Sequence, residues 1–185
     1  MVMGREIWLR PNRRAMAAGL VVPILLMIVA GGLLVLGGGS LGMRILSGLL
    51  LLLALLGFGA WWTLDRTPRM AYQGDELLIT LAIWQTHRIP IEYVECFFAG
   101  RAPALLPSPT GEAQETRVWS VVVRLAESAK EWHNRSVTSA WGEWKDGYIT
   151  IRGTWCEPID PPLLQELNHR LAEVHRQRRQ REATT

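Results

Sequence analysis

The sequence predicts a membrane α+β protein, in which a two-helix transmembrane hairpin precedes an antiparallel β-sheet domain with one C-terminal amphipathic helix. Three observations lead to this fold class. Two long runs, from Ala15 to Met43 and from Ile45 to Leu64, contain no charged side chain. Short segments with strand-like alternation follow them. The chain then ends in a segment whose leucines recur at helical spacing.

The hairpin is predicted over residues 15–64, with spans at 15–38 and 44–64, after a basic cytoplasmic tail at 1–14. About 20 residues of helix cross a hydrocarbon core about 30 Å thick, and both runs reach that length. Pro23 removes one helical hydrogen bond and predicts a modest bend in the first span. The glycine-rich link at 37–42 is short, so the two helices are expected to be adjacent and antiparallel.

A cleaved signal peptide is the alternative explanation of the first run, because basic residues precede it. Signal peptides have a shorter apolar core, of about 7–15 residues, and a second span follows here at once. The pattern therefore favours an uncleaved membrane anchor.

Arginines predict the orientation of the hairpin. They are frequent in the tail before the first span, and Arg66 and Arg69 follow the second span, whereas only Arg44 lies between the two uncharged runs. Basic residues are retained in the cytoplasm, so both termini are expected there, in a multi-pass protein of the bacterial inner membrane. Neither of the two uncharged runs contains an ionisable side chain, which argues against a transporter.

The domain is predicted over residues 66–185, with about five to seven strands. Val118 to Leu125 alternates like a half-buried strand, and Lys145-Asp146-Gly147 predicts a tight hairpin turn. Pro90 suggests an edge position or a bulge, and the proline-rich segment 102–116 is expected to be a loop. The other expected strands are Leu77–Trp84, Arg88–Phe98, Ser136–Trp144 and Tyr148–Cys156.

A final helix is predicted over residues 161–180. Asp160 is a suitable N-cap and Pro161 is favourable at the first helical position. One apolar stripe is formed by Leu163, Leu164, Leu167, Leu171 and Val174. Such a helix can cover the open end of a curved sheet.

Three segments have a pattern known from one family: Gly74-Asp75-Glu76-Leu77-Leu78-Ile79, Arg88-Ile89-Pro90-Ile91 with Val94, and Tyr148-Ile149-Thr150-Ile151 leading into the helix. With two spans before them, they make the chain resemble the bacterial pleckstrin-homology-like (PH-like) membrane proteins. The proline-rich loop and the many tryptophans depart from that pattern. The resemblance implies a two-layer sheet with a capping helix and a role in binding or assembly, and no ligand residue is carried over.

Residues for catalysis or metal binding are not found in a recognisable arrangement. Cys96 and Cys156 have no metal-ligand spacing and are interpreted as reduced, partly buried thiols. His169 and His175 lie six residues apart, on different helix faces, which predicts no metal site. Neither a phosphate-binding glycine loop nor a Gly-x-Ser-x-Gly elbow occurs in the domain. We therefore expect no enzyme activity and no cofactor, and the net charge of +3 is too small to favour nucleic acid.

Nine tryptophans are the unusual feature of the composition. Trp119 and Trp155 fit core positions, whereas residues three apart cannot share one strand face, so at least one of Trp141 and Trp144 is expected to be exposed. Exposed indoles beside cations can contact a partner or lipid headgroups, although core packing is the simpler explanation. The candidate contact residues are Trp132, Arg135, Trp141, Trp144 and Lys145.

A second candidate surface is the basic end of the last helix, with Arg176, Arg178 and Arg179. Such residues contribute about 1 kcal/mol each when they approach an anionic membrane. The alternative is a solvated, frayed helix end.

The function expected from these patterns is that of a membrane-anchored, non-catalytic binding or scaffolding module at the cytoplasmic face of the inner membrane. Its partners would be the lipid bilayer and a membrane protein or a second copy of the chain. An accessory subunit of a larger membrane complex is the alternative. A membrane-embedded enzyme is the least favoured, because the spans lack polar groups.

Overall fold

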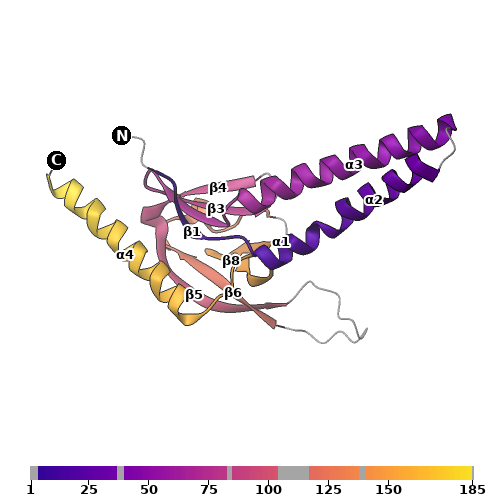
Figure 1. The fold of residues 1–185 in the computed structure, drawn as a ribbon. Coiled ribbons are helices and arrows are strands. Elements are labelled where there is room, and N and C mark those ends of the chain that lie inside the picture. The colour runs from indigo at the N-terminus through magenta and orange to yellow at the C-terminus, as the bar shows by residue number, and fades with distance from the viewer. Residues whose placement is uncertain (1–3, 37–39, 83–84, 104–116, 138–140, 185) are drawn as a thin grey trace. The chain divides into compact units, whose positions relative to one another are not determined.

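A computed structural model describes residues 4–36, 40–82, 85–103, 117–137 and 141–184 of the chain (Figure 1). The chain forms two compact units. One is a helical hairpin, Pro11–Thr67, and the other is a folded domain made from the chain before and after it.

The hairpin consists of α1 (Arg13–Gly19), α2 (Val21–Leu36) and α3 (Leu41–Arg66). The side chain of Asn12 caps α1 by accepting a hydrogen bond from the N–H of Arg14, at 3.0 Å. The helix is interrupted at Leu20, because Pro23 has no N–H to donate to the carbonyl of Gly19. The bend predicted from Pro23 is thus an interruption between two helices.

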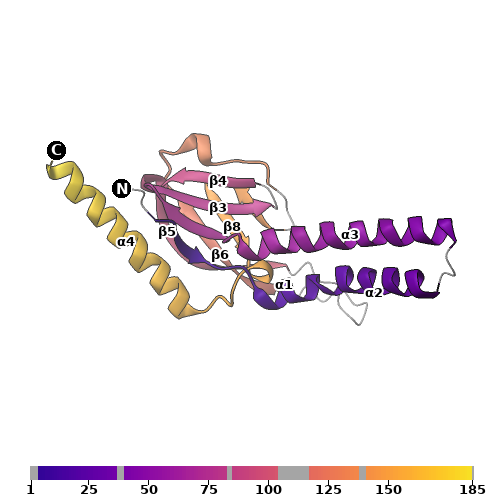
Figure 2. The same ribbon diagram turned by 45° about the horizontal axis from the view of Figure 1, so that its top comes forward.

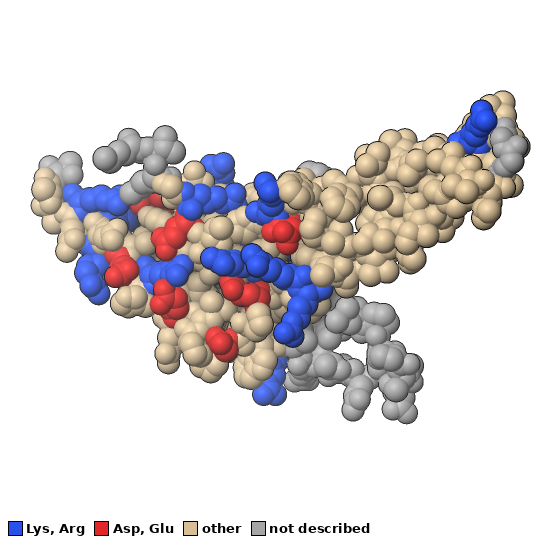
Figure 3. All heavy atoms as spheres, viewed as in Figure 1, with Lys and Arg blue, Asp and Glu red and all other residues tan. Residues whose placement is uncertain are grey.

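Two stretches of this unit, Arg13–Leu36 with 24 residues and Leu41–Arg66 with 26, are long and apolar enough to cross a membrane. In Figure 3 the surface of this unit is almost entirely uncharged. The helices pack through small residues: the Ser47 hydroxyl donates to the carbonyl of Ala30 at 2.7 Å, and Ala54 is fully buried. Small residues allow close approach of two helix backbones.

The domain contains two four-stranded antiparallel sheets (Figures 1 and 2). The first has the order β1-β2-β3-β4, and the second has the order β5-β6-β8-β7. The strands are β1 (Glu6–Leu9), β2 (Met70–Gln73), β3 (Glu76–Ala82), β4 (Gln85–Pro90), β5 (Val94–Pro103), β6 (Arg117–Leu125), β7 (Gly142–Lys145) and β8 (Tyr148–Arg152).

The N-terminal segment is a strand of the domain, whereas the sequence predicts only a basic tail there. Leu9 pairs with Met70 and Glu6 with Tyr72, so β1 lies beside β2 across the inserted hairpin. Trp8 and Leu9 are buried in the core. A segment of four residues flanked by arginines is too short to show strand periodicity, and its partner follows only after the hairpin.

Most predicted strands are found, with shifted ends. The segment Arg88–Phe98 is divided between β4 and β5, because a 3₁₀ turn at Ile91–Tyr93 follows Pro90. Asp146 and Gly147 have positive φ angles of 52° and 79°, which confirms the predicted tight turn between β7 and β8. The predicted strand positions 83–84 and 138–140, and loop positions 104–116, lie outside the described residues.

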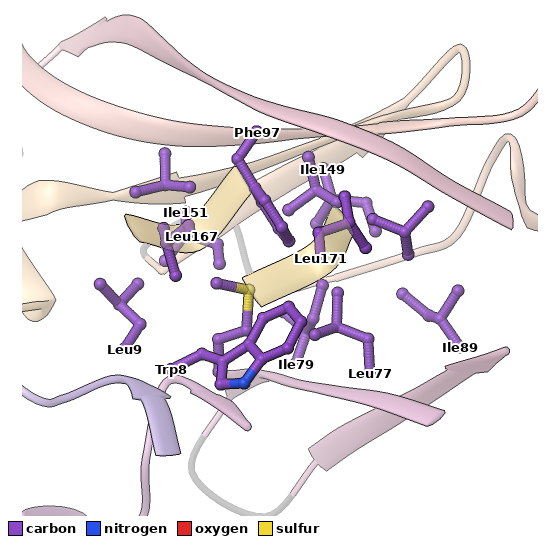
Figure 4. Close-up of a cluster of buried hydrophobic side chains, with 14 of the residues drawn as sticks. Trp8, Leu9, Leu77, Ile79, Ile89, Phe97, Ile149, Ile151, Leu167 and Leu171 are labelled. Atoms are coloured by element: carbon purple, nitrogen blue, oxygen red, sulfur yellow. The ribbon is translucent and has the colours of Figure 1, made fainter. Parts of the chain in front are cut away.

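The core lies between the two sheets (Figure 4). The Trp8 ring stacks on Tyr72 with centroids 5.6 Å apart and meets Phe97 edge-on at 5.9 Å. Strand β1 therefore links the first sheet to a strand of the second. Both sheets and the last helix contribute the other buried side chains, among them Leu77, Ile79, Ile89, Ile149, Ile151, Leu167 and Leu171.

Helix α4 (Pro161–Thr184) closes one side of the domain. The Asp160 carboxylate accepts from the N–H of Leu163 at 2.9 Å, which confirms the predicted N-cap. The Asn168 side chain forms hydrogen bonds with the edge of β5, as a neighbouring strand would. It accepts from the N–H of Phe97 at 2.9 Å and donates to the Phe97 carbonyl at 2.8 Å. Arg170 donates to the Ile7 carbonyl of β1 at 3.2 Å. The helix thereby covers the edge strands of both sheets.

Candidate functional site

A groove of 430 Å³ beside β7 gathers three of the predicted contact residues, Arg135, Trp144 and Lys145. We call this surface the β7 groove. Its remaining lining residues are Ser136, Val137, Gly142, Glu143 and Arg152. Sequence reasoning missed Arg152, which comes from β8 and reaches the groove only through strand pairing.

Trp144 lines the groove and belongs to a stack of two indoles beside it. The Arg135 guanidinium lies 4.5 Å from the centroid of Trp132, and Trp132 stacks on Trp144 with centroids 6.2 Å apart. The indole N–H of Trp144 donates to the Trp132 carbonyl. Trp144 is only 4% exposed, so it supports the groove from within the core, while Trp132 is half-buried. The groups available to a partner are therefore the exposed side chains of the groove, those of Arg135, Ser136, Glu143 and Lys145.

His87 of β4 contacts the inner end of this stack, meeting Trp144 edge-on at 5.1 Å. Its Nε2 atom is buried and has no hydrogen-bond partner among the described residues. Burial, and then the charge of Arg135, lower the pKa of His87 below its usual 6.5. The ring is therefore neutral at pH 7.

The charges of the β7 groove are unequal. Arg135, Lys145 and Arg152 line it together with a single carboxylate, Glu143. Arg135 and Lys145 are solvent-exposed, so binding a partner there requires little desolvation of buried charge. An anionic or acidic partner surface is the complement of this groove.

Trp141 is not part of the β7 groove, and it is only 9% exposed. The prediction that at least one of Trp141 and Trp144 is exposed is therefore wrong. Strand β7 begins after Trp141, so the alternation of strand faces does not extend to it. The Trp141 ring contacts two groups: Arg69, 3.9 Å from its centroid, and Trp155, stacked at 5.8 Å.

Arg69 is buried in the domain, although the sequence counts it among the cations that follow the second span. Its Nε donates to the Trp155 carbonyl at 2.9 Å, while Nη1 and Nη2 have no hydrogen-bond partner among the described residues. Burial lowers the pKa of Arg69 to about 10 and raises that of the neighbouring Cys156 thiol to about 12. These contacts join the chain that follows α3 to the chain that precedes α4.

The second candidate surface is a 740 Å³ groove along α4 that contains Arg176, Arg178 and Arg179. Arg178 forms ion pairs with Glu92 and Glu182, which raise its pKa further. Glu92, Glu95 and Glu182 line the same groove, so its cations are largely balanced by carboxylates.

The position of this helix end within the domain is also informative. Arg181 lies 3.5 Å from Asp75, in the turn between β2 and β3. That turn is at the end of β2 opposite Met70, which is where the chain arrives from the hairpin. The α4 end thus lies at the opposite end of β2 from the residues that join the domain to its hairpin.

Metal-binding and redox centres are not indicated in the described part of the chain. No three His, Cys, Asp or Glu side chains come together there in a way that could hold a metal ion. Cys96 and Cys156 are both unbridged thiols.

Comparison of the chain with protein-family models, with curated proteins and with solved structures finds no match.

Proposed function

We propose that this chain is a membrane-anchored, non-catalytic binding module that presents a PH-like domain at the cytoplasmic face of a bacterial inner membrane. The observation that carries the proposal is the position of the hairpin in the chain. It is inserted between β1 and β2, two neighbouring strands of one sheet.

The insertion determines how the domain is tethered. Residues 10–12 connect β1 to α1, and residues 67–69 connect α3 to β2. A segment of three residues extends at most about 10 Å. Because Leu9 and Met70 are paired, both ends of the hairpin emerge from one edge of the domain, on the same side of any bilayer that it crosses. The basic residues flanking both ends favour the cytoplasmic side.

Apolar side chains on the hairpin surface support insertion into a bilayer. Ile28, Val35 and Leu55 are among the many large apolar residues that are exposed along α2 and α3. In water each such side chain is unfavourable by about 1.5–3 kcal/mol relative to an apolar environment. Lipid hydrocarbon removes that cost along the whole length of both helices.

The architecture of the domain supports the PH-like assignment. Two antiparallel sheets enclose one core, and a single C-terminal helix covers edge strands of both. This is the arrangement that the sequence resemblance implies. The β7 groove, with its exposed cations, is the surface proposed to contact an acidic segment of a membrane-protein partner.

The test is co-purification of the full-length protein in mild detergent, with Lys145→Glu as the groove variant. Lys130→Glu is the matched control, because Lys130 is exposed in the preceding 3₁₀ turn but does not line the groove. We expect the Lys145→Glu protein to lose its partner and the control to retain it. Arg135→Glu, which also removes the cation over Trp132, is expected to have the same effect.

Two outcomes contradict this proposal in different ways. Recovery of the protein in the soluble fraction, without detergent, would refute the membrane anchor. Retention of a stoichiometric membrane partner by all three variants would refute the role of the groove. It would favour the alternative of an accessory subunit held by its helices.

A further inference from the structure

Trp119 is an exposed tryptophan, although the sequence places it in the core. It belongs to the same series of β6 residues as Val121 and Val123, which are fully buried, yet its side chain is 52% exposed. Its strand partner is Arg101 of β5, whose guanidinium lies 5.1 Å from the centroid of the indole. The hydrophobic core therefore ends before Trp119. The Trp119 indole, with the Arg101 guanidinium beside it, extends beyond the core.

Direct contacts locate this pair at one particular end of the domain. A Cβ on Gly153 would lie 2.1 Å from the Trp119 carbonyl oxygen, so the backbones of these two residues are in close contact. Two residues after Gly153, the Trp155 carbonyl accepts from Arg69. Two residues further, the N–H of Glu157 donates to the carbonyl of Arg10, at 3.0 Å.

The chain leaves β1 at Arg10, and it enters β2 from Arg69. Trp119 and Arg101 consequently lie at the end of the domain where both connections to the hairpin begin. Tyr148 provides the contrast. It is 42% exposed on the same sheet, but it starts β8 beside the tight turn, whereas Arg152 ends β8 beside Trp141. Four residues of strand separate Tyr148 from that end, or about 13 Å.

We propose that Trp119 and Arg101 contact the lipid headgroups of the bilayer that the hairpin crosses. Indoles are favoured at the membrane–water interface, and a guanidinium binds phosphate through paired hydrogen bonds. Two short connections already hold this end of the domain near the bilayer, so the contact requires little further loss of freedom. It leaves Tyr148 and its strand partner Lys145 at the end of the sheet that faces the aqueous phase, where Lys145 is free to bind a partner.

This inference rests on the proposed membrane anchoring, and its test uses the full-length protein in nanodiscs of phosphatidylcholine and phosphatidylglycerol. An environment-sensitive fluorophore is attached through Trp119→Cys or, as the matched control, Tyr148→Cys. Both carry Cys96→Ser, and Cys156 is buried and does not react. The quencher is a lipid that carries a nitroxide close to its headgroup.

We expect the nitroxide lipid to quench most of the emission from position 119 and little of that from position 148. Quenching at position 119 should increase with the fraction of phosphatidylglycerol, and Arg101→Gln should abolish that increase. Equal quenching at the two positions, or none at 119, would overturn the inference. Incorporation into nanodiscs is scored separately, so failure of the anchor is distinguishable from failure of the lipid contact.

Discussion

Removal of the Trp8 side chain tests whether the N-terminal segment is part of the folded domain. Trp8 is 3% exposed and contacts Tyr72 of β2 and Phe97 of β5. Truncation of a buried tryptophan to alanine costs about 3–5 kcal/mol. We expect Trp8→Ala to lower the free energy of unfolding by that amount, measured by urea titration in detergent micelles with near-UV circular dichroism.

Two further variants refine the expected magnitude. The Nε1 atom of Trp8 is buried without a partner among the described residues, and such a group costs about 1–3 kcal/mol. Trp8→Phe removes that N–H, which offsets the loss of ring area, so it should remain within about 1 kcal/mol of the wild type. Ile7→Ala is the neighbouring control, because Ile7 is 44% exposed and should change stability by less than about 1 kcal/mol. Equal effects of Trp8→Ala and Ile7→Ala would refute the assignment of β1 to the core.

Three other predictions concern the domain. Asn168→Ala leaves the N–H and C=O of Phe97 without partners and should cost about 2–4 kcal/mol in the same urea titration. Folding lowers the pKa of His87. As the pH falls, this histidine is therefore protonated in the unfolded chain at a higher pH than in the folded chain. The free energy of unfolding should therefore fall as the pH drops below about 6.5, and His87→Phe should flatten that dependence between about pH 5 and pH 8. Mass spectrometry after maleimide treatment should find Cys96 labelled, whereas Cys156, whose pKa is raised to about 12, should react only in denaturant. Labelling of Cys156 at the rate of Cys96 would contradict its burial.

Local patterns were sufficient to predict several elements of the structure. Long uncharged runs predict α2 and α3, and the alternation at 118–125 predicts β6. Turn and capping residues act over a few positions, which is why Asp146-Gly147 and Asp160 have the predicted roles. Strand β1 has no such local signal, since its burial depends on pairing with β2 beyond the hairpin.

Side-chain exposure was less predictable than the elements, because it depends on where each strand ends relative to the core. Trp141 precedes its strand and is covered by Arg69, while Trp119 lies on a buried strand face but beyond the core. Arg135 and Lys145 do converge on one groove, as neighbours of a predicted hairpin turn. His87 contacts Trp144 from the other sheet, a contact that no sequence spacing indicates.

The central claim is that the hairpin crosses a membrane while both of its ends remain attached to one cytoplasmic domain. The most direct measurement is cysteine labelling in intact bacterial cells with a membrane-impermeant maleimide, in a Cys96→Ser background. The labelled positions are introduced by Ser40→Cys in the link between the spans, Ile7→Cys in β1 and Tyr148→Cys in β8; all three wild-type side chains are exposed. We predict labelling at position 40 in intact cells, and at positions 7 and 148 only after permeabilisation. Labelling of positions 7 and 148 in intact cells would contradict the account. Labelling that places these two positions on opposite sides of the membrane would contradict it as well.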